Sequence, residues 1–204
     1  DLFGATPELL VRRTGGLVMS RVLAGTVRRQ GDKSTDADLA SDLMKSHKDL
    51  AEHEYAVHSV AKALATHCTD LEVPEQPRVL ELANVQHLAT DITGQLASEA
   101  PILSLVASLH PTAAVCGTPT ERAKAMIPEL EGMNRGRYAG PVGWFDHHGD
   151  GEFGIALRCA KIDQESRTVR SFAGCGIVAG SIPELELAES AAKLAPVRDA
   201  LESS

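Results

Sequence analysis

Two acidic residues near the end of the sequence have the type and spacing that a divalent cation needs. Glu186 and Glu189 are three residues apart, in a segment that opens with Ser181–Glu184 and has the Ser, Pro and Glu pattern of a helix start. Residues three apart share one helix face, where two carboxylates repel each other unless a cation lies between them. Hard ions such as magnesium take oxygen ligands of this kind. The alternative is a solvated acidic helix start, which the helix dipole favours.

A third carboxylate, Glu52, lies in the segment Lys48–His53, inside the longest predicted helix. Lys48 and Glu52 are four residues apart, so they can form an ion pair on an exposed helix face. In the functional alternative, Glu52 is a further metal ligand. The segment alone leaves both interpretations open.

Other residue types that carry chemistry are present without the spacing that their sites require. His47, His53, His58 and His67 share that helix, but no two are four residues apart as in HExxH, and the sequence has no CxxC pair, so zinc is disfavoured. No GxSxG elbow supports a hydrolase triad. Gly174–Gly180 lacks the GxGxxG spacing, although its backbone amides could hold an anionic oxygen.

Composition and charge exclude several classes of protein. The 204 residues contain 20 Lys and Arg against 28 Asp and Glu, for a formal net charge of −8, and aromatic residues are only 3%. A chain this acidic, with little stacking surface, is a poor general binder of nucleic acid or of anionic membranes. No apolar run approaches the roughly 20 residues that cross a bilayer, and four separated cysteines favour reduced thiols. We therefore expect a cytoplasmic protein.

The elements that must position these residues favour an α+β fold with antiparallel sheets. Apolar periodicity predicts helices over Asp36–Cys68, over Thr120–Met133 with Thr120 as N-cap, and from Pro183 to about Glu202 with Ser181 as N-cap. Strands are expected within Asp1–Arg13, in Leu17–Leu23 after a Gly15-Gly16 turn, and as a three-stranded meander over Tyr138–Val178 with turns at 148–151 and 163–166. Periodicity leaves Ile102–Leu109 open between strand and helix.

Several strings of residues occur together in an order that resembles one enzyme family. They are Gly4–Glu8, Ala24–Thr26, Lys48–His53, Leu109–Pro119, Arg135–Gly140, Gly174–Val178 and Pro183–Glu189. This order resembles that of the chorismate-utilising enzymes, which include isochorismate, anthranilate, salicylate and aminodeoxychorismate synthases. The resemblance covers nearly all 204 residues. It implies the fold of anthranilate synthase component I, with antiparallel sheets flanked by helices, and residues 1–204 as the C-terminal portion of a single chorismate-binding catalytic domain.

The resemblance also implies roles for individual residues. Magnesium would hold the carboxylate of chorismate through Glu52, Glu186 and Glu189. The general acid would be Glu8, in a Gly-Ala-Ser-Pro-Glu motif where Thr6 replaces Ser, and it would protonate the departing C4 hydroxyl while water adds at C2. Because a useful acid keeps its proton near neutral pH, we expect a raised pKa for Glu8. The implied substrate-binding residues are His87, Ala114, Tyr138, Arg158, Gly176 and Lys193.

Two positions favour one member of the family. Aminodeoxychorismate synthases carry a Lys nucleophile where this sequence has Ala24, and anthranilate and salicylate synthases tend to carry Thr where it has Ala114. The resemblance therefore implies water as nucleophile and isochorismate as product, for siderophore, menaquinone or another pathway. Salicylate synthase is the alternative. We expect a monomer that binds chorismate without an amidotransferase subunit.

One residue of the family pattern has no match. The water-activating Lys lies upstream of the Gly-Ala-Ser-Pro-Glu motif, and no Lys of this sequence corresponds to it. The sequence also begins at Asp1 without Met, so we expect the N-terminal part of the domain to be absent. Because that Lys is missing, we expect residues 1–204 alone to be inactive or nearly so, and a chorismate-binding fragment is a further alternative to the enzyme.

Overall fold

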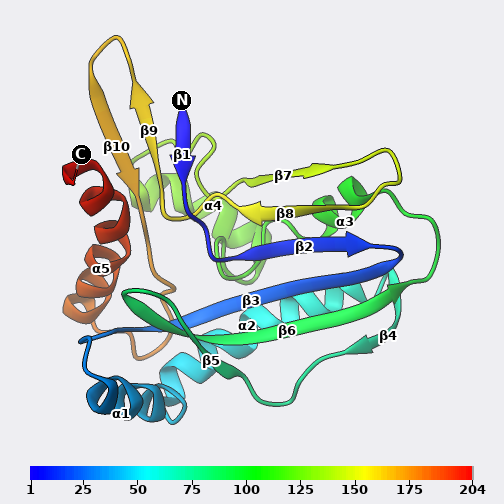
Figure 1. The fold of residues 1–204 in the computed structure, drawn as a ribbon, viewed down its shortest axis with the longest axis horizontal. Helices are drawn as coiled ribbons and strands as arrows, with labels where there is room; N and C mark the ends of the chain where they lie inside the picture. The colour runs from blue at the N-terminus through cyan, green and yellow to red at the C-terminus, as the bar shows by residue number, and fades with distance from the viewer. Residues whose placement is uncertain (204) are drawn as a thin grey trace.

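A seven-stranded antiparallel sheet is the framework of the structure, a computed structural model that describes residues 1–203 (Figure 1). Its strands follow the order β4-β6-β3-β2-β8-β7, with β5 also paired to β6, and a second sheet has the order β1-β9-β10. The strands are β1 (Leu2–Gly4), β2 (Leu9–Thr14), β3 (Leu17–Arg28), β4 (Cys68–Glu72), β5 (Arg78–Glu81), β6 (Val85–Leu96), β7 (Pro141–Phe145), β8 (Gly151–Ile155), β9 (Cys159–Asp163) and β10 (Thr168–Phe172). The helices are α1 (Lys33–Leu43), α2 (His47–Leu64), α3 (Ile102–Leu109), α4 (Thr120–Glu131) and α5 (Pro183–Glu202). This confirms the predicted α+β class.

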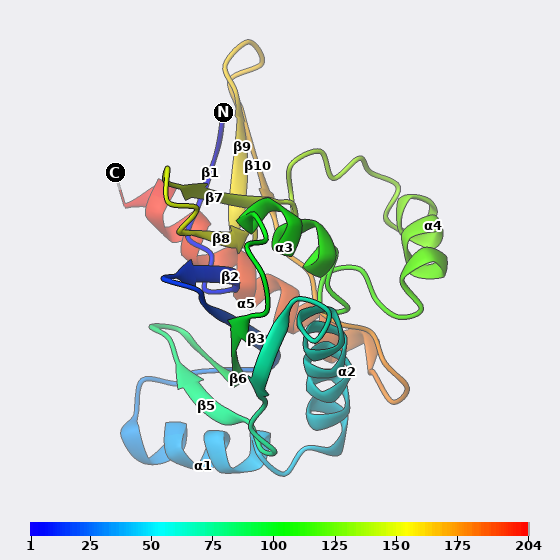
Figure 2. The same cartoon turned by 90° about the vertical axis from the view of Figure 1, so that its right-hand side faces the viewer.

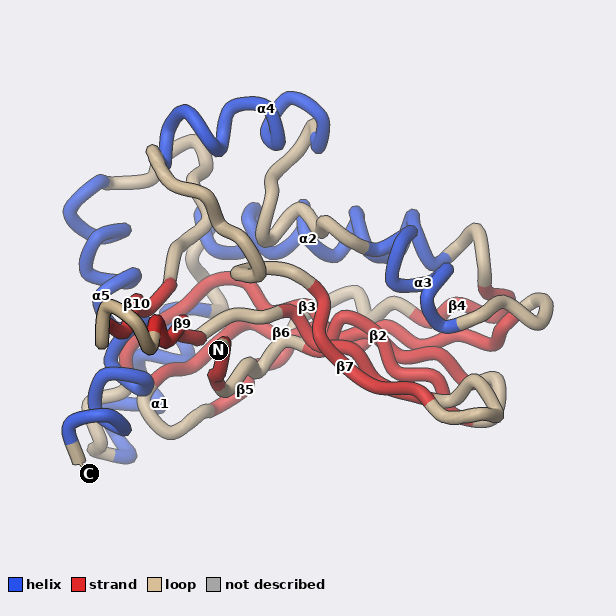
Figure 3. The backbone as a smooth tube through the Cα atoms, turned by 90° about the horizontal axis from the view of Figure 1, so that it is seen from above, coloured by secondary structure: helices blue, strands red, loops and turns tan. Residues whose placement is uncertain are grey.

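Helices α2 and α3 cover one face of the large sheet, and the main core lies between them and the strands (Figure 3). Helix α2 presents residues at a spacing of four to the sheet, because such residues share one helix face. The buried side chains of this core include Leu10, Val18, Val22 and Ile92 from the strands, Ala56, Val60 and Leu64 from α2, and Ile102, Leu105 and Leu109 from α3. The packed face of α2 therefore fixes that helix against β3 and β6.

The central ladder between β3 and β6 contains an irregularity that brings α2 close. The register shifts between Ala24 and Thr26, and Gly25 at that point has φ +73°. A Cβ on Gly25 would lie 3.0 Å from the Cβ of Asp49 on α2. Glycine therefore serves two needs here, since it accepts a left-handed backbone and leaves room for the helix.

The single helix expected over Asp36–Cys68 is wrong, because the structure has two helices with a break at residues 44–46. Ser46 is the N-cap of α2, and its hydroxyl accepts a hydrogen bond from the backbone N–H of Asp49 at 3.3 Å. Ser and Asp bond readily to nearby backbone groups, so they start a new helix within an otherwise continuous apolar pattern. At the far end Cys68 already belongs to β4.

The three-stranded meander expected over Tyr138–Val178 is also wrong. The segment forms two hairpins in different sheets: β7–β8 in the large one and β9–β10 in the small one. The chain leaves the first sheet just before Arg158, which has φ +47°, and joins the second at Cys159. Both expected turns are present, and Asp163 accepts hydrogen bonds from the backbone of Glu165 and Ser166 at 3.1 Å.

The structure decides three local expectations about the helices: one about a whole segment and two about N-caps. Ile102–Leu109, left open by periodicity, is helix α3. Thr120 and Ser181 are not N-caps, because Pro119 and Ile182 occupy those positions without side-chain capping bonds. Figure 2 shows α4 standing apart from the sheets, in agreement with its lack of buried residues.

Strand β7 forms one edge of the large sheet, and every one of its residues is exposed. Trp144, the single tryptophan of the sequence, is 62% exposed on this strand, and Phe145 is 55% exposed beside it. Within residues 1–203, no helix combines the length and the apolar character that crossing a bilayer requires.

Replacement of Leu64 by alanine tests the packing of α2. Leu64 has 0% exposure, so Leu64→Ala should lower the free energy of unfolding by about 2–5 kcal/mol, through lost transfer energy and a cavity. Leu130→Ala on α4, where the side chain is 76% exposed, is the matched control and should change it by less than about 0.5 kcal/mol. Urea unfolding followed by circular dichroism measures both. Equal effects would contradict the packing of α2.

Candidate active site

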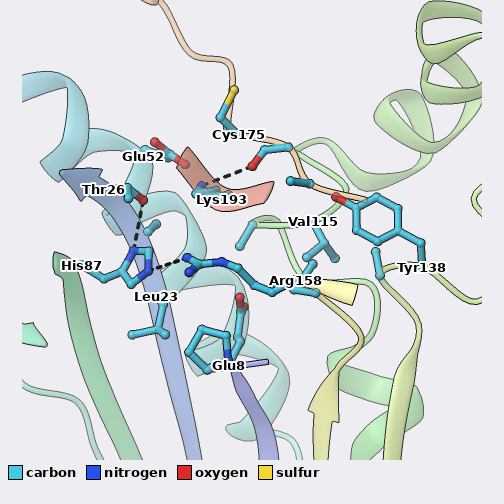
Figure 4. A pocket seen from close by; sticks show the side chains of 18 of the residues that line it. Glu8, Leu23, Thr26, Glu52, His87, Val115, Tyr138, Arg158, Cys175 and Lys193 are labelled. Atoms are coloured by element: carbon cyan, nitrogen blue, oxygen red, sulfur yellow. Dashed lines mark hydrogen bonds between the residues drawn. The ribbon is translucent and has the colours of Figure 1, made fainter. Parts of the chain in front are cut away.

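A cavity opens where β3, β6 and the loop before β9 meet the segment that leads into α5 (Figure 4). Eight of the ten residues predicted to form the site line this cavity: Glu8, Glu52, His87, Ala114, Tyr138, Arg158, Gly176 and Lys193. The remaining two, Glu186 and Glu189, lie beside it on α5, where Glu189 pairs with Lys193. Residues separated by up to 185 positions in the sequence therefore surround one cavity.

Glu8 is a buried carboxyl group at the start of β2. Burial raises its pKa to about 7, although Lys193 and Arg158 act in the opposite direction. Its backbone is fixed on both sides: its N–H donates to Thr6 Oγ1 at 3.3 Å, and its carbonyl accepts from the N–H of Ile155 at 3.2 Å. Glu8 is therefore about half protonated at pH 7, where an ordinary carboxyl group is ionised, and the raised pKa expected from the sequence is confirmed.

His87 on β6 holds the side chain of Arg158. Its Nε2 lies 2.7 Å from Nη2 of Arg158, and its Nδ1 lies 3.0 Å from Thr26 Oγ1 and 3.3 Å from the carbonyl of Gly25 (Figure 4). A guanidinium only donates hydrogen bonds, so Nε2 accepts and the ring proton is on Nδ1. Burial and the nearby Arg158 lower the pKa of His87 to about 3. The imidazole is therefore neutral and acts as an acceptor for Arg158.

Arg158 is a buried cation that faces the cavity without an anionic partner. Its side chain belongs to a residue that is 8% exposed, and no carboxylate of residues 1–203 forms an ion pair with it. Burial lowers its pKa, while the more distant charges of Glu189 and Glu8 raise it. Since a buried charge without a partner is costly, the free N–H groups of Arg158 form a built site for an anion such as a carboxylate.

The three predicted metal-ligating glutamates lie in the N-terminal halves of α2 and α5. Burial and repulsion from Glu189 raise the pKa of Glu52. Glu186 forms an ion pair with Lys48 at 2.6 Å, and Glu189 forms one with Lys193 at 2.7 Å. The ion pair expected between Lys48 and Glu52 does not occur, because Lys48 is directed toward α5.

The donor set at this junction suits a hard cation. Both carboxylate oxygens of Glu186 are buried without a hydrogen bond of normal geometry. Burial raises the pKa of Glu186, but the neighbouring Lys48 and Ser181 outweigh this effect and lower it. As the side chains stand, no three His, Cys, Asp or Glu groups among the described residues converge on one point. The carboxylates thus have the chemistry of a divalent-ion site. In this structure the ammonium groups of Lys48 and Lys193 pair with Glu186 and Glu189.

The other predicted residues shape the cavity wall. A Cβ on Gly176 would overlap Oε1 of Glu52, so any other residue at this position would displace the Glu52 carboxylate. Tyr138 stacks on Phe172 with ring centroids 5.1 Å apart, which fixes the edge of the cavity. Ala24 and Ala114 contribute small apolar side chains to the lining.

Three residues of the site were not predicted to have a role in it. Thr26 bonds His87, Lys48 bonds Glu186, and Arg135 lies over the Tyr138 ring at 5.6 Å from its centroid. All three lie inside strings that carry the family resemblance, so the strings marked their positions. What each side chain contacts depends on pairing between distant elements, and no local pattern reports it.

Comparisons with known proteins identify the family of the chain. Residues 1–202 match a family model described as chorismate binding enzyme. Isochorismate synthase DhbC of Bacillus subtilis (strain 168) is 47% identical over 193 residues, which are 94% of this chain and 48% of the relative. Isochorismate synthase MenF of the same organism is 43% identical over 198 residues, which are 97% of this chain and 42% of the relative.

The fold agrees as well. The structure of MenF, the menaquinone-specific isochorismate synthase from Escherichia coli, superposes with a TM-score of 0.86 at 36% identity, covering 97% of this chain and 45% of that one. The chain spans about half the length of the curated relatives it matches. By its sequence over residues 1–202 and by its fold, the chain belongs to the chorismate binding enzyme family.

Proposed function

We propose that the protein is an isochorismate synthase, which isomerises chorismate by adding water at C2 while the C4 hydroxyl group leaves. The observation that carries the proposal is the pair formed by Arg158 and Glu8: a buried guanidinium without an anion beside a carboxyl group that keeps its proton. One binds a carboxylated ligand and the other protonates a leaving group. The names of the relatives support the same reaction.

Binding of chorismate is assigned to the cations of the cavity. Arg158, held by neutral His87, presents its remaining N–H groups to a substrate carboxylate, for which a guanidinium fork is well suited. Lys193 adds a second positive charge close by. Tyr138, Ala114 and the backbone at Gly176 complete the substrate wall, where the absence of a side chain on Gly176 allows close approach.

Proton transfer is assigned to Glu8. The departing C4 oxygen needs a proton to leave as water, and Glu8 carries one at neutral pH because burial raises its pKa to about 7. Water rather than an amine is the attacking group, since the cavity has alanine at position 24. The proton that this water releases goes to a base, for which the family pattern implies a Lys upstream of the Gly-Ala-Ser-Pro-Glu motif.

Magnesium is proposed as the cofactor, held by Glu52, Glu186 and Glu189. When bound there it would supply positive charge to a substrate carboxylate, in addition to Arg158 and Lys193. The burial of the Glu186 carboxylate and the all-carboxylate donor set support this choice.

Product analysis tests the proposal directly. Chorismate and MgCl2 incubated with the purified full-length protein, which supplies the segment upstream of Asp1, should give isochorismate, separated by liquid chromatography. Glu8→Gln removes the acid and should lower kcat by about 10²–10⁴-fold, and Glu186→Gln should raise the MgCl2 concentration required. Glu54→Gln on the exposed face of α2 is the control and should behave like the unchanged protein. Salicylate as the main product would show that the protein is a salicylate synthase instead. Unaltered rates in both Glu8→Gln and Glu186→Gln would refute the proposal.

The pH dependence of kcat/KM tests the role of Glu8. An acid must be protonated to act, so kcat/KM should fall as the pH rises through about 7, the pKa of buried Glu8. The residual activity of Glu8→Gln should lack this descending limb. Initial rates at low chorismate between pH 5.5 and about 9 provide the profile. A limb that persists in Glu8→Gln assigns the titration to another group.

Substitution of Arg158 tests the anion site. Arg158→Lys keeps the charge but loses the fork, and with it the bond to His87, so KM for chorismate should rise at least about tenfold. Arg170→Lys, at an exposed position of β10, should leave KM unchanged. A KM that is equal in both variants would place substrate binding elsewhere.

A further inference from the structure

The ion pair between Lys48 and Glu186 joins the first turns of α2 and α5. The ammonium nitrogen lies 2.6 Å from Oε1 of Glu186, and the side chains are 27% and 6% exposed, respectively. Glu186 is thus more than nine-tenths buried, with both oxygens lacking a hydrogen bond of normal geometry. The ammonium group of Lys48 neutralises the charge of Glu186, but it does not use the full bonding capacity of the two carboxylate oxygens.

The position of Lys48 gives no advantage to its own helix. Lys48 is the second residue of α2, where the unpaired N–H groups carry the positive end of the helix dipole. A carboxylate is favoured there, as Asp49 is, and a lysine is disfavoured. The stabilisation of Lys48 comes from acids around it: Glu186 first, then Asp49 and Glu189, raise its pKa against the effect of burial, which lowers it.

Lys48 offsets part of the negative charge at the junction. Four carboxylates interact there, Asp49, Glu52, Glu186 and Glu189, and the ammonium groups of Lys48 and Lys193 oppose them. A divalent cation that binds Glu186 approaches the ammonium group of Lys48 within a few ångströms and is repelled by it. The divalent cation and the ammonium group of Lys48 therefore require the same carboxylate, that of Glu186.

We propose that Lys48 is a built-in counter-ion that competes with the divalent cation for Glu186, so that the cation binds only as the ammonium group moves away. The proposal rests on the proposed function, because it takes the junction of α2 and α5 as the cation site. It makes Lys48 a residue that weakens metal affinity while it stabilises the acidic junction when no metal is bound. The exposed fraction of its side chain provides a path into solvent.

Titration with MgCl2 in the absence of chorismate tests the competition. Lys48→Met keeps the aliphatic stem and removes the charge, so isothermal titration calorimetry should give a Kd for Mg²⁺ about tenfold lower than that of the unchanged protein. Lys48→Arg keeps the charge and should stay within about twofold of the original Kd. Lys62→Met, at an exposed position in the last turn of α2, is the matched control and should not change the Kd.

Thermal unfolding provides a second readout that does not depend on turnover. In EDTA, Lys48→Met leaves Glu186 buried without its cation, so the Tm should fall by several degrees, and MgCl2 should restore it more than it raises the Tm of the unchanged protein. Lys48→Gln replaces Lys48→Met if the latter does not fold. In the double variant Lys48→Met with Glu186→Gln, the gain in affinity should disappear, since it passes through Glu186.

The results separate this proposal from the proposed function. A Kd in Lys48→Met that is equal to or higher than the original overturns the competition, whether or not isochorismate is formed. Absence of Mg²⁺ binding in the unchanged protein and in every variant also overturns it. The product assay, run in parallel, tests the reaction by itself, so that isochorismate formation with an unaffected Kd leaves the proposed function standing and removes the role of Lys48.

Discussion

Compensation of buried charge at the junction of α2 and α5 is the constraint on which the site depends. Carboxylates removed from water stay ionised only beside a cation, and the fold supplies Lys48 to Glu186 and Lys193 to Glu189. Glu8 and Glu52 have no ion pair of this kind, and burial raises the pKa of both carboxyl groups. One electrostatic rule thus separates the ion-paired carboxylates from those that hold a proton more readily.

The two β-sheets fix where the side chains around Arg158 lie. The β3–β6 ladder holds Thr26 opposite His87, so the two residues meet across paired strands and orient the imidazole toward Arg158. Arg158 in turn stands where the chain passes from the large sheet to the small one, in a left-handed conformation. The guanidinium that lines the cavity is therefore held by residues of both sheets.

Local patterns in the sequence predicted most of the elements and failed where the outcome depended on competition between neighbours. Apolar spacing identified α2, yet Ser46 ends the continuity of the preceding run by capping a new helix. Turn residues located the strands of 138–178, but their division between two sheets follows from pairing with β1 and β2, far away in the sequence. No strand was expected where β4, β5 and β6 lie. The candidate site came from ordered motifs. The contacts of Lys48 could not come from them, because the spacing to Glu52 suggested a partner on its own helix while the fold brought Glu186 nearer.

The open edge strand β7 has an optical consequence. Trp144, the one indole in the sequence, projects from that strand into solvent, whereas the cavity is lined by other residues. Intrinsic emission excited at the indole band therefore monitors the rim of the large sheet, and a partner that pairs with β7 would shift it. Trp144 also lines a hollow together with Glu8 and Arg12, so its emission reports on this edge of the sheet and on the start of β2 beside it.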